Sequence, residues 1–314
     1  MSTAIHIIAY ASVVLFLGAI IAKVVAYLKK PMHVRWELYP VAHDPRAAHG
    51  GSYLEDSGWW KKEPKVNRIG ELKVMIPEIL LLKAVWEHNR PLWYVTYPFH
   101  LGLYLICAFL GLQVLGAILL LAGVAVYPGV GGIGGLISLG AKILGPAGFG
   151  LALLGALGLV VKRLTDENLK AYSSAGHFFN LGLFIVTLGL ATVTWWIRDP
   201  DFVGSRMLLA SLIGFKFVPI HDTLFGVTAL LAFATVAYIP MTHMSHFFMK
   251  YFLYHDIRWG DEPNINHPET DAKIATVLNY PVSWAASHIE GDGKKTWAEV
   301  ATFNPMRPNG EEVK

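Results

Sequence analysis

Long apolar segments recur five times along this chain of 314 residues. They cover residues 4–27, 93–126, 146–161, 177–197 and 219–252. An α-helix needs about 20 apolar residues to cross the ~30 Å hydrocarbon core of a bilayer, and these segments meet or approach that length. Charged residues make up 16% of the chain, whereas a soluble domain carries about 25%. The sequence therefore predicts an all-α membrane protein built as a five-transmembrane-helix bundle.

The loop between the first two segments is rich in lysine and arginine and sets the predicted orientation. Loops with this composition stay on the cytoplasmic side, which places the N-terminus outside and the C-terminus in the cytoplasm. Within the loop, residues 69–88 have helical apolar spacing broken by Pro77, which indicates an interfacial helix or a docking surface. The N-terminal segment lacks a basic start and a cleavage motif, so we expect it to be retained as the first span.

The predicted boundaries give four parts. These are a first transmembrane helix at 1–28, a cytoplasmic loop at 29–91, a four-helix membrane core at 92–253 and a cytoplasmic tail at 254–314. The tail is polar and too small for a core of its own, so we expect it to dock on a partner. The connection at 198–217 is long enough for a short helix. Residues 127–135 formally match G-x-G-x-x-G, but no strand precedes them, and we interpret them as an external turn.

Histidines stand at both ends of the last apolar segment. His221 and His246 are 25 residues apart, which in one continuous helix is a rise of roughly 37 Å and brings both side chains to nearly the same face. His243 lies within about 40° of that direction. Aligned imidazoles at the two rims indicate ligands for a metal or a haem. Single histidines near water are also tolerated as interfacial residues, so that alternative stays open.

The predicted topology sorts the membrane histidines by depth. The cytoplasmic side holds His100, His177, His243 and His246, and the outer side holds His6 and His221. A haem b between helices needs two imidazoles at one depth on facing helices, with small residues to admit the ring. We therefore expect haem iron to be bound by His100, beside Gly102, together with His246 or His243. His177 and His6 are weaker candidates, because each stands at the end of a span.

Cysteine usage limits the redox chemistry. Cys107 is the sole cysteine and lies inside an apolar segment. The chain therefore has no disulfide, no C-x-x-C-H haem attachment and no iron–sulfur motif. A redox function needs a non-covalent cofactor and a partner subunit. We expect membrane lipid, and no nucleic acid, among its partners.

Three sequence stretches carry a resemblance to a known family. They are FHLGLYL at 99–105, YIPMTHMSHFFMKYF at 238–252 and YHDIRW at 254–259. With the five-span plan, they resemble the nitrate reductase gamma subunit-like membrane cytochrome b family, closest to its DsrM/TmcC/HdrE-like branch. The resemblance implies an inner haem b held by His100 and His246. It also implies electron transfer in a prokaryotic cytoplasmic membrane between menaquinone, or a periplasmic multihaem cytochrome c, and a cytoplasmic HdrD/DsrK-like iron–sulfur subunit.

The chain departs from the family pattern at the outer haem. The two positions of its histidine ligands hold Leu110 and Thr228, neither of which can ligate haem iron. A second haem is then absent, or it lies shallow with His221 and a further ligand such as His6. Lys142 matches a lysine associated with quinol in the family. With His221 and Asp222, it forms the set of quinone-site candidates, although a lysine that snorkels to water is an alternative.

The expected function is therefore that of a haem b electron-transfer subunit in a quinone-linked oxidoreductase complex. One alternative is the gamma subunit of a nitrate reductase or a dehydrogenase. Another is a haem-free membrane scaffold or a transporter. Transporters often carry charged sites in broken helices at mid-membrane, whereas the mid-span positions here are aliphatic, which disfavours transport.

Overall fold

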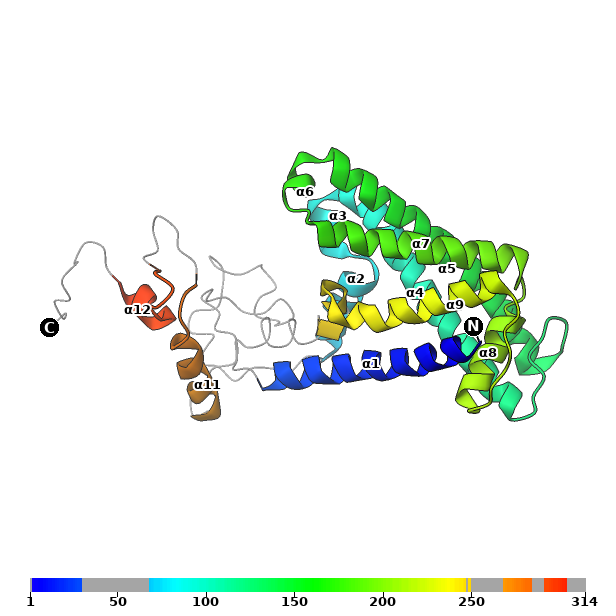
Figure 1. Cartoon of the computed structure of the whole chain (residues 1–314). Coiled ribbons are helices and arrows are strands. Elements are labelled where there is room, and N and C mark those ends of the chain that lie inside the picture. The colour runs from blue at the N-terminus through cyan, green and yellow to red at the C-terminus, as the bar shows by residue number, and fades with distance from the viewer. Residues whose placement is uncertain (1, 30–67, 247, 250–267, 284–290, 304–314) are drawn as a thin grey trace. The chain divides into compact units, whose positions relative to one another are not determined.

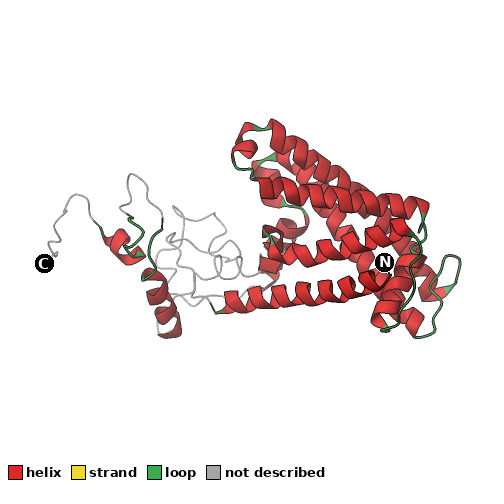
Figure 2. Cartoon of the chain, in the orientation of Figure 1, coloured by secondary structure: helices red, strands yellow, loops and turns green. Residues whose placement is uncertain are grey.

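Helices account for nearly all of the regular structure in the computed structural model, which describes residues 2–29, 68–246, 248–249, 268–283 and 291–303 (Figure 2). In these ranges there is no strand, only an isolated bridge between Pro281 and Thr296. Five of the described helices are long and apolar enough to cross a membrane, as predicted. They are α1 (Ser2–Leu28), α4 (Arg90–Leu121), α5 (Gly132–Thr165), α7 (Ala175–Ile197) and α9 (Thr223–Tyr238), the last counted with the helical turn that extends it to Met241.

The chain divides into two compact units. The first, which we call the bundle, comprises Met1–Ile21 and Met75–Ser245. The second comprises Ala22–Val74 and His246–Lys314, and its described helices include α11 (Pro268–Leu278) and α12 (Trp297–Thr302). In the bundle, α5 packs between α4 and α7, α9 packs on α7, and α8 (Val203–Ile213) packs on α4 (Figure 1). The short helix expected in the 198–217 connection is therefore confirmed as α8.

Glycines set the close, antiparallel contact of α4 with α5. A Cβ at Gly102 would lie 2.7 Å from the Cα atom of Ala152, and a Cβ at Gly155 would lie 2.6 Å from that of Phe99. Small residues let two backbones approach closely, which is a principal source of helix association in membranes. Residue numbers fall along α5 as they rise along α4, so the start of α4 and the end of α5 share one end of the bundle.

Helices α7 and α9 meet through paired polar side chains. The hydroxyl groups of Thr187 and Thr235 lie 3.0 Å apart, and those of Thr194 and Thr228 lie 2.7 Å apart. On each helix the two threonines are seven residues apart, so they occupy one face. This pairing is antiparallel too. The end of α9 therefore lies beside the start of α7, at the same end of the bundle as the start of α4.

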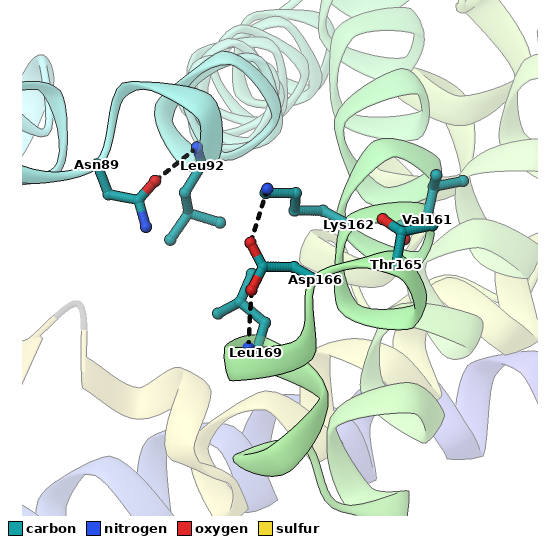
Figure 3. Close-up of polar contacts among 7 residues, drawn as sticks. All are labelled: Asn89, Leu92, Val161, Lys162, Thr165, Asp166 and Leu169. Carbon is teal, nitrogen blue, oxygen red and sulfur yellow. Dashed lines mark hydrogen bonds and ion pairs between the residues drawn. The ribbon is translucent and has the colours of Figure 1, made fainter.

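Helix caps close the turns at that end (Figure 3). The side chain of Asn89 accepts a hydrogen bond from the backbone N–H of Leu92 at 3.1 Å and so caps α4. Asp166 ends α5 and caps the short helix α6 (Glu167–Ala171), because its carboxylate accepts from the N–H of Leu169 at 3.1 Å. The same carboxylate pairs with Lys162 at 2.8 Å. Both caps satisfy backbone donors that a helix start leaves unpaired.

The start of α5 lies earlier than predicted. Residues 127–135 were interpreted as an external turn and the span as 146–161, yet the helix begins at Gly132. The glycine run misled that prediction, because glycine is typical of loops. Here glycine is needed for space: a Cβ at Gly134 would collide with the carbonyl oxygen of Ala125, and one at Gly135 with that of Val130. The loop folds back tightly over the first turn of the helix.

The last apolar segment is not one continuous helix, which corrects the alignment expected for its histidines. Helix α9 begins at Thr223, after His221, and ends at Tyr238. Two short 3-10 helices follow, η3 (Ile239–Met241) and η4 (His243–Ser245). Pro240 accounts for the break, since proline lacks the N–H that continues an α-helix. The rise and angle calculated between His221 and His246 for a single helix therefore do not apply.

The segment before α4 forms two helices, α2 (Arg68–Leu80) and α3 (Lys83–His88). Pro77 lies inside α2, and the break comes instead at Leu82, which has a left-handed backbone with φ 52°. Aromatic side chains of α4 hold the break against the bundle. The Trp93 indole donates to the carbonyl of Leu81 at 2.8 Å, and the Tyr104 hydroxyl donates to that of Ile79 at 2.6 Å.

Candidate functional site

A cleft opens at the end of the bundle where α8 and the start of α9 meet, and we call it the α8–α9 cleft. Its volume is about 510 Å³. Its walls come from the end of α7, the following loop, α8 and the residues that precede α9. The polar lining residues include Arg198, Asp199, Asp201, His221 and Asp222, and the apolar ones include Met207, Leu208, Ile220 and Phe225. This mixed lining suits a ligand with an apolar body and a polar head.

Asp222 fixes one wall of the cleft. One carboxylate oxygen accepts a hydrogen bond from the N–H of Phe225 at 2.7 Å and so caps α9. The other oxygen pairs with Nε of Arg198 at 3.0 Å. One carboxylate therefore ties the start of α9 to the end of α7. His221 precedes it outside any helix, and its exposed side chain also lines the cleft.

Lys142 reaches this end of the bundle from α5. Its ammonium group forms an ion pair with the carboxylate of Asp201, which lines the cleft. Both side chains are about two-fifths exposed, at 43% and 38%, so the pair adds little stability. The three predicted quinone-site residues thus gather at one end, with Lys142 at the rim and His221 and Asp222 in the wall.

The buried carboxylate of Asp199 holds the first turn of α8. It accepts hydrogen bonds from the N–H of Gly204 at 2.9 Å, and from the N–H and hydroxyl of Ser205 at 2.8 and 2.6 Å. The N-terminal turn of a helix presents unpaired N–H groups and a partial positive charge, both of which favour a carboxylate. These contacts fix the part of α8 that borders the cleft.

Arg206 was not among the predicted site residues, yet it is completely buried on α8. Its Nη1 donates to the carbonyl of Val126 at 2.9 Å, whereas Nε and Nη2 have no partner among the described residues. Gly116 makes room for it, because a Cβ there would lie 2.8 Å from Nε. Burial lowers the pKa of the guanidinium, and the charge of Asp199 opposes that shift. A lone arginine in an apolar stretch was the available signal.

Gln113 borders the same buried region from α4. Its side-chain nitrogen donates to the carbonyl of Phe202 at 3.4 Å, and the N–H of Arg206 donates to that carbonyl at 3.1 Å. The Gln113 side-chain oxygen and the hydroxyl of buried Ser138 are unpaired within the described part of the chain. Unpaired buried polar groups cost about 1–3 kcal/mol each and are rare in folded proteins. Within the described residues, the unpaired buried side-chain atoms belong to Arg206, Gln113 and Ser138.

His6 lies near the cleft but faces α8. Its Nδ1 contacts the carbonyl of Ser2 at 2.9 Å, and its Nε2 contacts the hydroxyl of Ser211 at 3.4 Å. The side chain is buried and its ring lies 5.0 Å from that of Phe217. In the described part of the chain no contact joins His6 to His221. The structure therefore does not bring the two outer-side haem candidates, His6 and His221, together.

His100 lies at the opposite end of the bundle, on the first turns of α4. Its Nδ1 is 2.8 Å from the carbonyl oxygen of Thr96, one turn earlier. When Nδ1 carries the proton in this contact, Nε2 keeps the lone pair that binds a metal. Gly102, expected to admit a haem ring, faces Ala152 on α5 instead. That glycine serves helix packing, and the expectation for it is corrected.

His177 and His243 lie together at the same end of the bundle. Their ring centres are 5.1 Å apart. The Nδ1 atom of His177 contacts the hydroxyl of Ser174 at 2.9 Å, and that of His243 contacts the side-chain nitrogen of Asn180 at 3.3 Å. The Tyr238 hydroxyl donates to the Asn180 oxygen at 2.9 Å. Two of the weaker haem candidates are thus joined in one polar cluster.

His246 is exposed and belongs to the second unit, whereas His100 belongs to the bundle. Its pairing with His100 therefore stays a prediction. The expected docking tail at 254–314 lies partly outside the described residues, as does much of the basic loop at 29–91.

Comparison with protein-family models, curated proteins and solved structures found no match for this chain. The fold and its apolar helices define a multi-pass α-helical membrane protein.

Proposed function

We propose that this chain is the haem b-carrying membrane subunit of a respiratory complex in a prokaryotic cytoplasmic membrane. The supporting observation is the contact of His100 Nδ1 with the Thr96 carbonyl at 2.8 Å. Metal-ligating histidines usually donate their second ring N–H to such an acceptor, which fixes the tautomer and orients the ring. A partly buried imidazole with this support, on an apolar spanning helix, has the donor chemistry of an axial haem ligand.

His100 and His246 are the proposed ligands. His246 has the same donor chemistry and is carried over from the family resemblance. A haem b bound by them supplies one-electron transfer. The role of His100 is to hold the iron and to keep its own ring oriented through Thr96. The cytoplasmic partner that exchanges electrons is proposed to be an HdrD/DsrK-like iron–sulfur subunit.

The residues at the outer haem positions favour a single haem. Leu110 is 45% exposed on α4, and the Thr228 hydroxyl is paired with that of Thr194 at 2.7 Å. Both ring nitrogens of His6 already have polar contacts. A second haem would therefore need His221 and a rearrangement of α1 or α8.

The α8–α9 cleft is the proposed menaquinol site, on the outer side of the membrane. Its apolar walls fit an isoprenoid quinol, and Asp222 and His221 are positioned to accept protons. Oxidation of one menaquinol releases two electrons and two protons, and these two side chains would pass the protons to the outer water. The Arg198–Asp222 pair at 3.0 Å holds this carboxylate in the wall of the cleft, next to His221.

The distance between the two ends requires a further electron carrier. From His100 to the end of α4 at Leu121 the helix rises by roughly 30 Å. Electron tunnelling over that length in one step is too slow for respiration. Either a second haem held by His221 would link the cleft to the His100 haem, or electrons from the cleft would go to a periplasmic multihaem cytochrome c and not to the His100 haem. Haem stoichiometry separates these two arrangements.

The test measures haem b per chain in the purified membrane form, with a redox titration and with reduction by a menaquinol analogue. We expect one haem with a single potential, lost in both His100→Ala and His246→Ala and kept in His243→Ala. Two potentials, one of them lost in His221→Ala, would establish the second haem. A colourless protein would overturn the proposal and favour a membrane scaffold. Co-purification with a molybdenum reductase or a dehydrogenase would favour the gamma-subunit alternative.

A further inference from the structure

The break between α2 and α3 has its backbone carbonyl groups bound by side chains of α4. The end of an α-helix leaves carbonyls without partners inside that helix. At this break the Tyr104 hydroxyl donates to the carbonyl of Ile79 at 2.6 Å, and the Trp93 indole donates to that of Leu81 at 2.8 Å. In water such carbonyls are hydrated, whereas in hydrocarbon each of them needs a donor from the protein. The two contacts therefore meet the requirement for a helix break inside a membrane.

The same contacts fix the level of the break along α4. Trp93 and Tyr104 are 11 residues apart, which is a rise of roughly 17 Å in a helix. The carbonyls that they bind are only two residues apart, so the break lies beside α4 between these two levels. Trp86 and Tyr97 contact Trp93, with ring centres 4.8 and 4.4 Å from its own. Tryptophan and tyrosine collect at the membrane–water boundary, so the break lies on the hydrocarbon side of Trp93.

The outer side of the break is apolar and exposed. Ile76, Leu80 and Leu81 are 51%, 49% and 52% exposed. Ile76 and Leu80 are four residues apart and therefore share one face of α2. Leu110, on the spanning helix α4, is exposed to a similar extent at 45%. The exposed side chains at the break therefore continue the apolar surface that α4 presents to lipid.

The charged residues near the break are directed away from it. Lys83 stands in the first turn of α3, but its ammonium group pairs with Glu87, one turn further along, at 3.7 Å. A lysine in a membrane places its charge toward the water in this way. Arg90, at the start of α4, lies over the ring of Trp86 at 4.8 Å. These charges thus lie toward the start of α4, and the exposed apolar side chains lie at the break.

We propose that residues 76–86 form a re-entrant elbow in the leaflet at the His100 end of the bundle, with Ile76, Leu80 and Leu81 against lipid acyl chains. The chain then has one membrane-inserted element in addition to its five spans. The sequence of residues 69–88 was compatible with an interfacial helix or with a docking surface for a partner. The level of the break beside α4 and its bound carbonyls favour lipid. The elbow depends on neither haem nor quinone, so this proposal and the proposed function fail separately.

The test uses spin labels on single cysteines in the full-length chain, with Cys107→Ala as the background, in vesicles of phosphatidylcholine and phosphatidylglycerol. Labels at Leu80→Cys and Leu81→Cys should be more accessible to oxygen, which enters hydrocarbon, than to a water-soluble nickel chelate. Leu110→Cys is the lipid-facing reference, and His88→Cys, exposed at the end of α3, is the aqueous one. Nickel accessibility equal to that of His88→Cys would place the elbow in water and overturn the proposal. Low accessibility to both reagents would show that protein covers the elbow, which would also overturn it.

A second measurement uses the parent chain and guards against misfolded variants. A phospholipid with a photoreactive diazirine in its acyl chain should label the peptide that contains residues 76–81. Labelling of α4 without labelling of this peptide would contradict the insertion of the elbow.

A third measurement tests the role of the two bound carbonyls. Trp93→Phe combined with Tyr104→Phe removes both donors and should reverse the preference of the Leu81→Cys label from oxygen to nickel. Tyr97→Phe keeps both donors and serves as the matched control, in which the preference is unchanged. The same preference in the double variant as in the control would refute the argument from the carbonyls.

Discussion

A single methyl group at Gly102 should separate α4 from α5 beside His100. The added Cβ would lie 2.7 Å from Cα and 2.8 Å from Cβ of Ala152. Carbon atoms in contact prefer about 3.5–4.0 Å, so the two helices would have to move apart by roughly 1 Å. Overpacking of this kind costs about 1–3 kcal/mol. Because backbone lies on both sides of the contact, no rotamer change can relieve it.

A matched control isolates the contact from helix propensity. Gly111 lies on the same helix, and a Cβ there would meet no described atom within 4 Å. Alanine is favoured over glycine inside a helix by about 1 kcal/mol, so Gly111→Ala should be as stable as the parent or more stable. Gly102→Ala should be about 1–3 kcal/mol less stable than Gly111→Ala. Gly155→Ala, which would place its Cβ 2.6 Å from Cα of Phe99, should repeat the loss.

The free energy of unfolding can be measured by titrating the protein in mixed micelles with sodium dodecyl sulfate and following helix content. The comparison between the two alanine variants is the quantity of interest, since it cancels propensity and micelle effects. Equal stability of Gly102→Ala and Gly111→Ala would refute the argument. It would mean that α4 and α5 are not in backbone contact at this level.

Three further outcomes follow from the contacts described above. A double-mutant cycle of Thr194→Val and Thr228→Val should give a coupling of about 0.6 kcal/mol, since hydrogen bonds between membrane helices average that value, and no coupling would show that the hydroxyl pair is absent. The pKa of Asp166 is lowered, chiefly by its hydrogen bond with Lys162. The stability that this carboxylate adds is therefore present above the usual aspartate pKa of about 3.9, and it is lost as pH falls through the lower pKa of the folded state. Thermal unfolding from pH 7 to 3 should show this loss in the parent, and Asp166→Asn should be less stable at pH 7 and lack that component. Tyr104→Phe should weaken the attachment of α2 by about 1 kcal/mol, seen as faster amide exchange in α2, and unchanged exchange would contradict the contact with the Ile79 carbonyl.

Apolar length alone predicted the five spans, because a helix in lipid must satisfy its own backbone hydrogen bonds and expose apolar side chains. The predicted helix boundaries were wrong where one residue type occurs both in turns and in close helix packing. Glycine at 134 and 135 signals a turn by propensity but serves close packing inside α5. Helix α9 stops before Pro240, so His221 and His246 do not lie on one continuous helix.

The candidate site could be predicted only in part for a related reason. Lys142, His221 and Asp222 are polar residues at span ends, and the ends of helices in one bundle gather at two faces, so their convergence followed from topology. The burial of Arg206 could not be predicted in this way, because its environment depends on how α8 folds back against α4. The contact of His177 with His243 likewise depends on the break after α9. The prediction of one continuous helix contained no such break, so this contact was not expected.

The buried arginine has a consequence for the order in which the chain assembles. Arg206 needs the notch at Gly116 and the carbonyl of Val126, and both exist only once α4, the loop after it and α5 have formed a hairpin. Until then the guanidinium must remain in the water at the membrane surface, because an isolated charge in hydrocarbon is too costly. Helix α8 can therefore dock only onto a finished hairpin. Synthesis proceeds from the N-terminus, so α4, the loop after it and α5 are made before α8 and its Arg206.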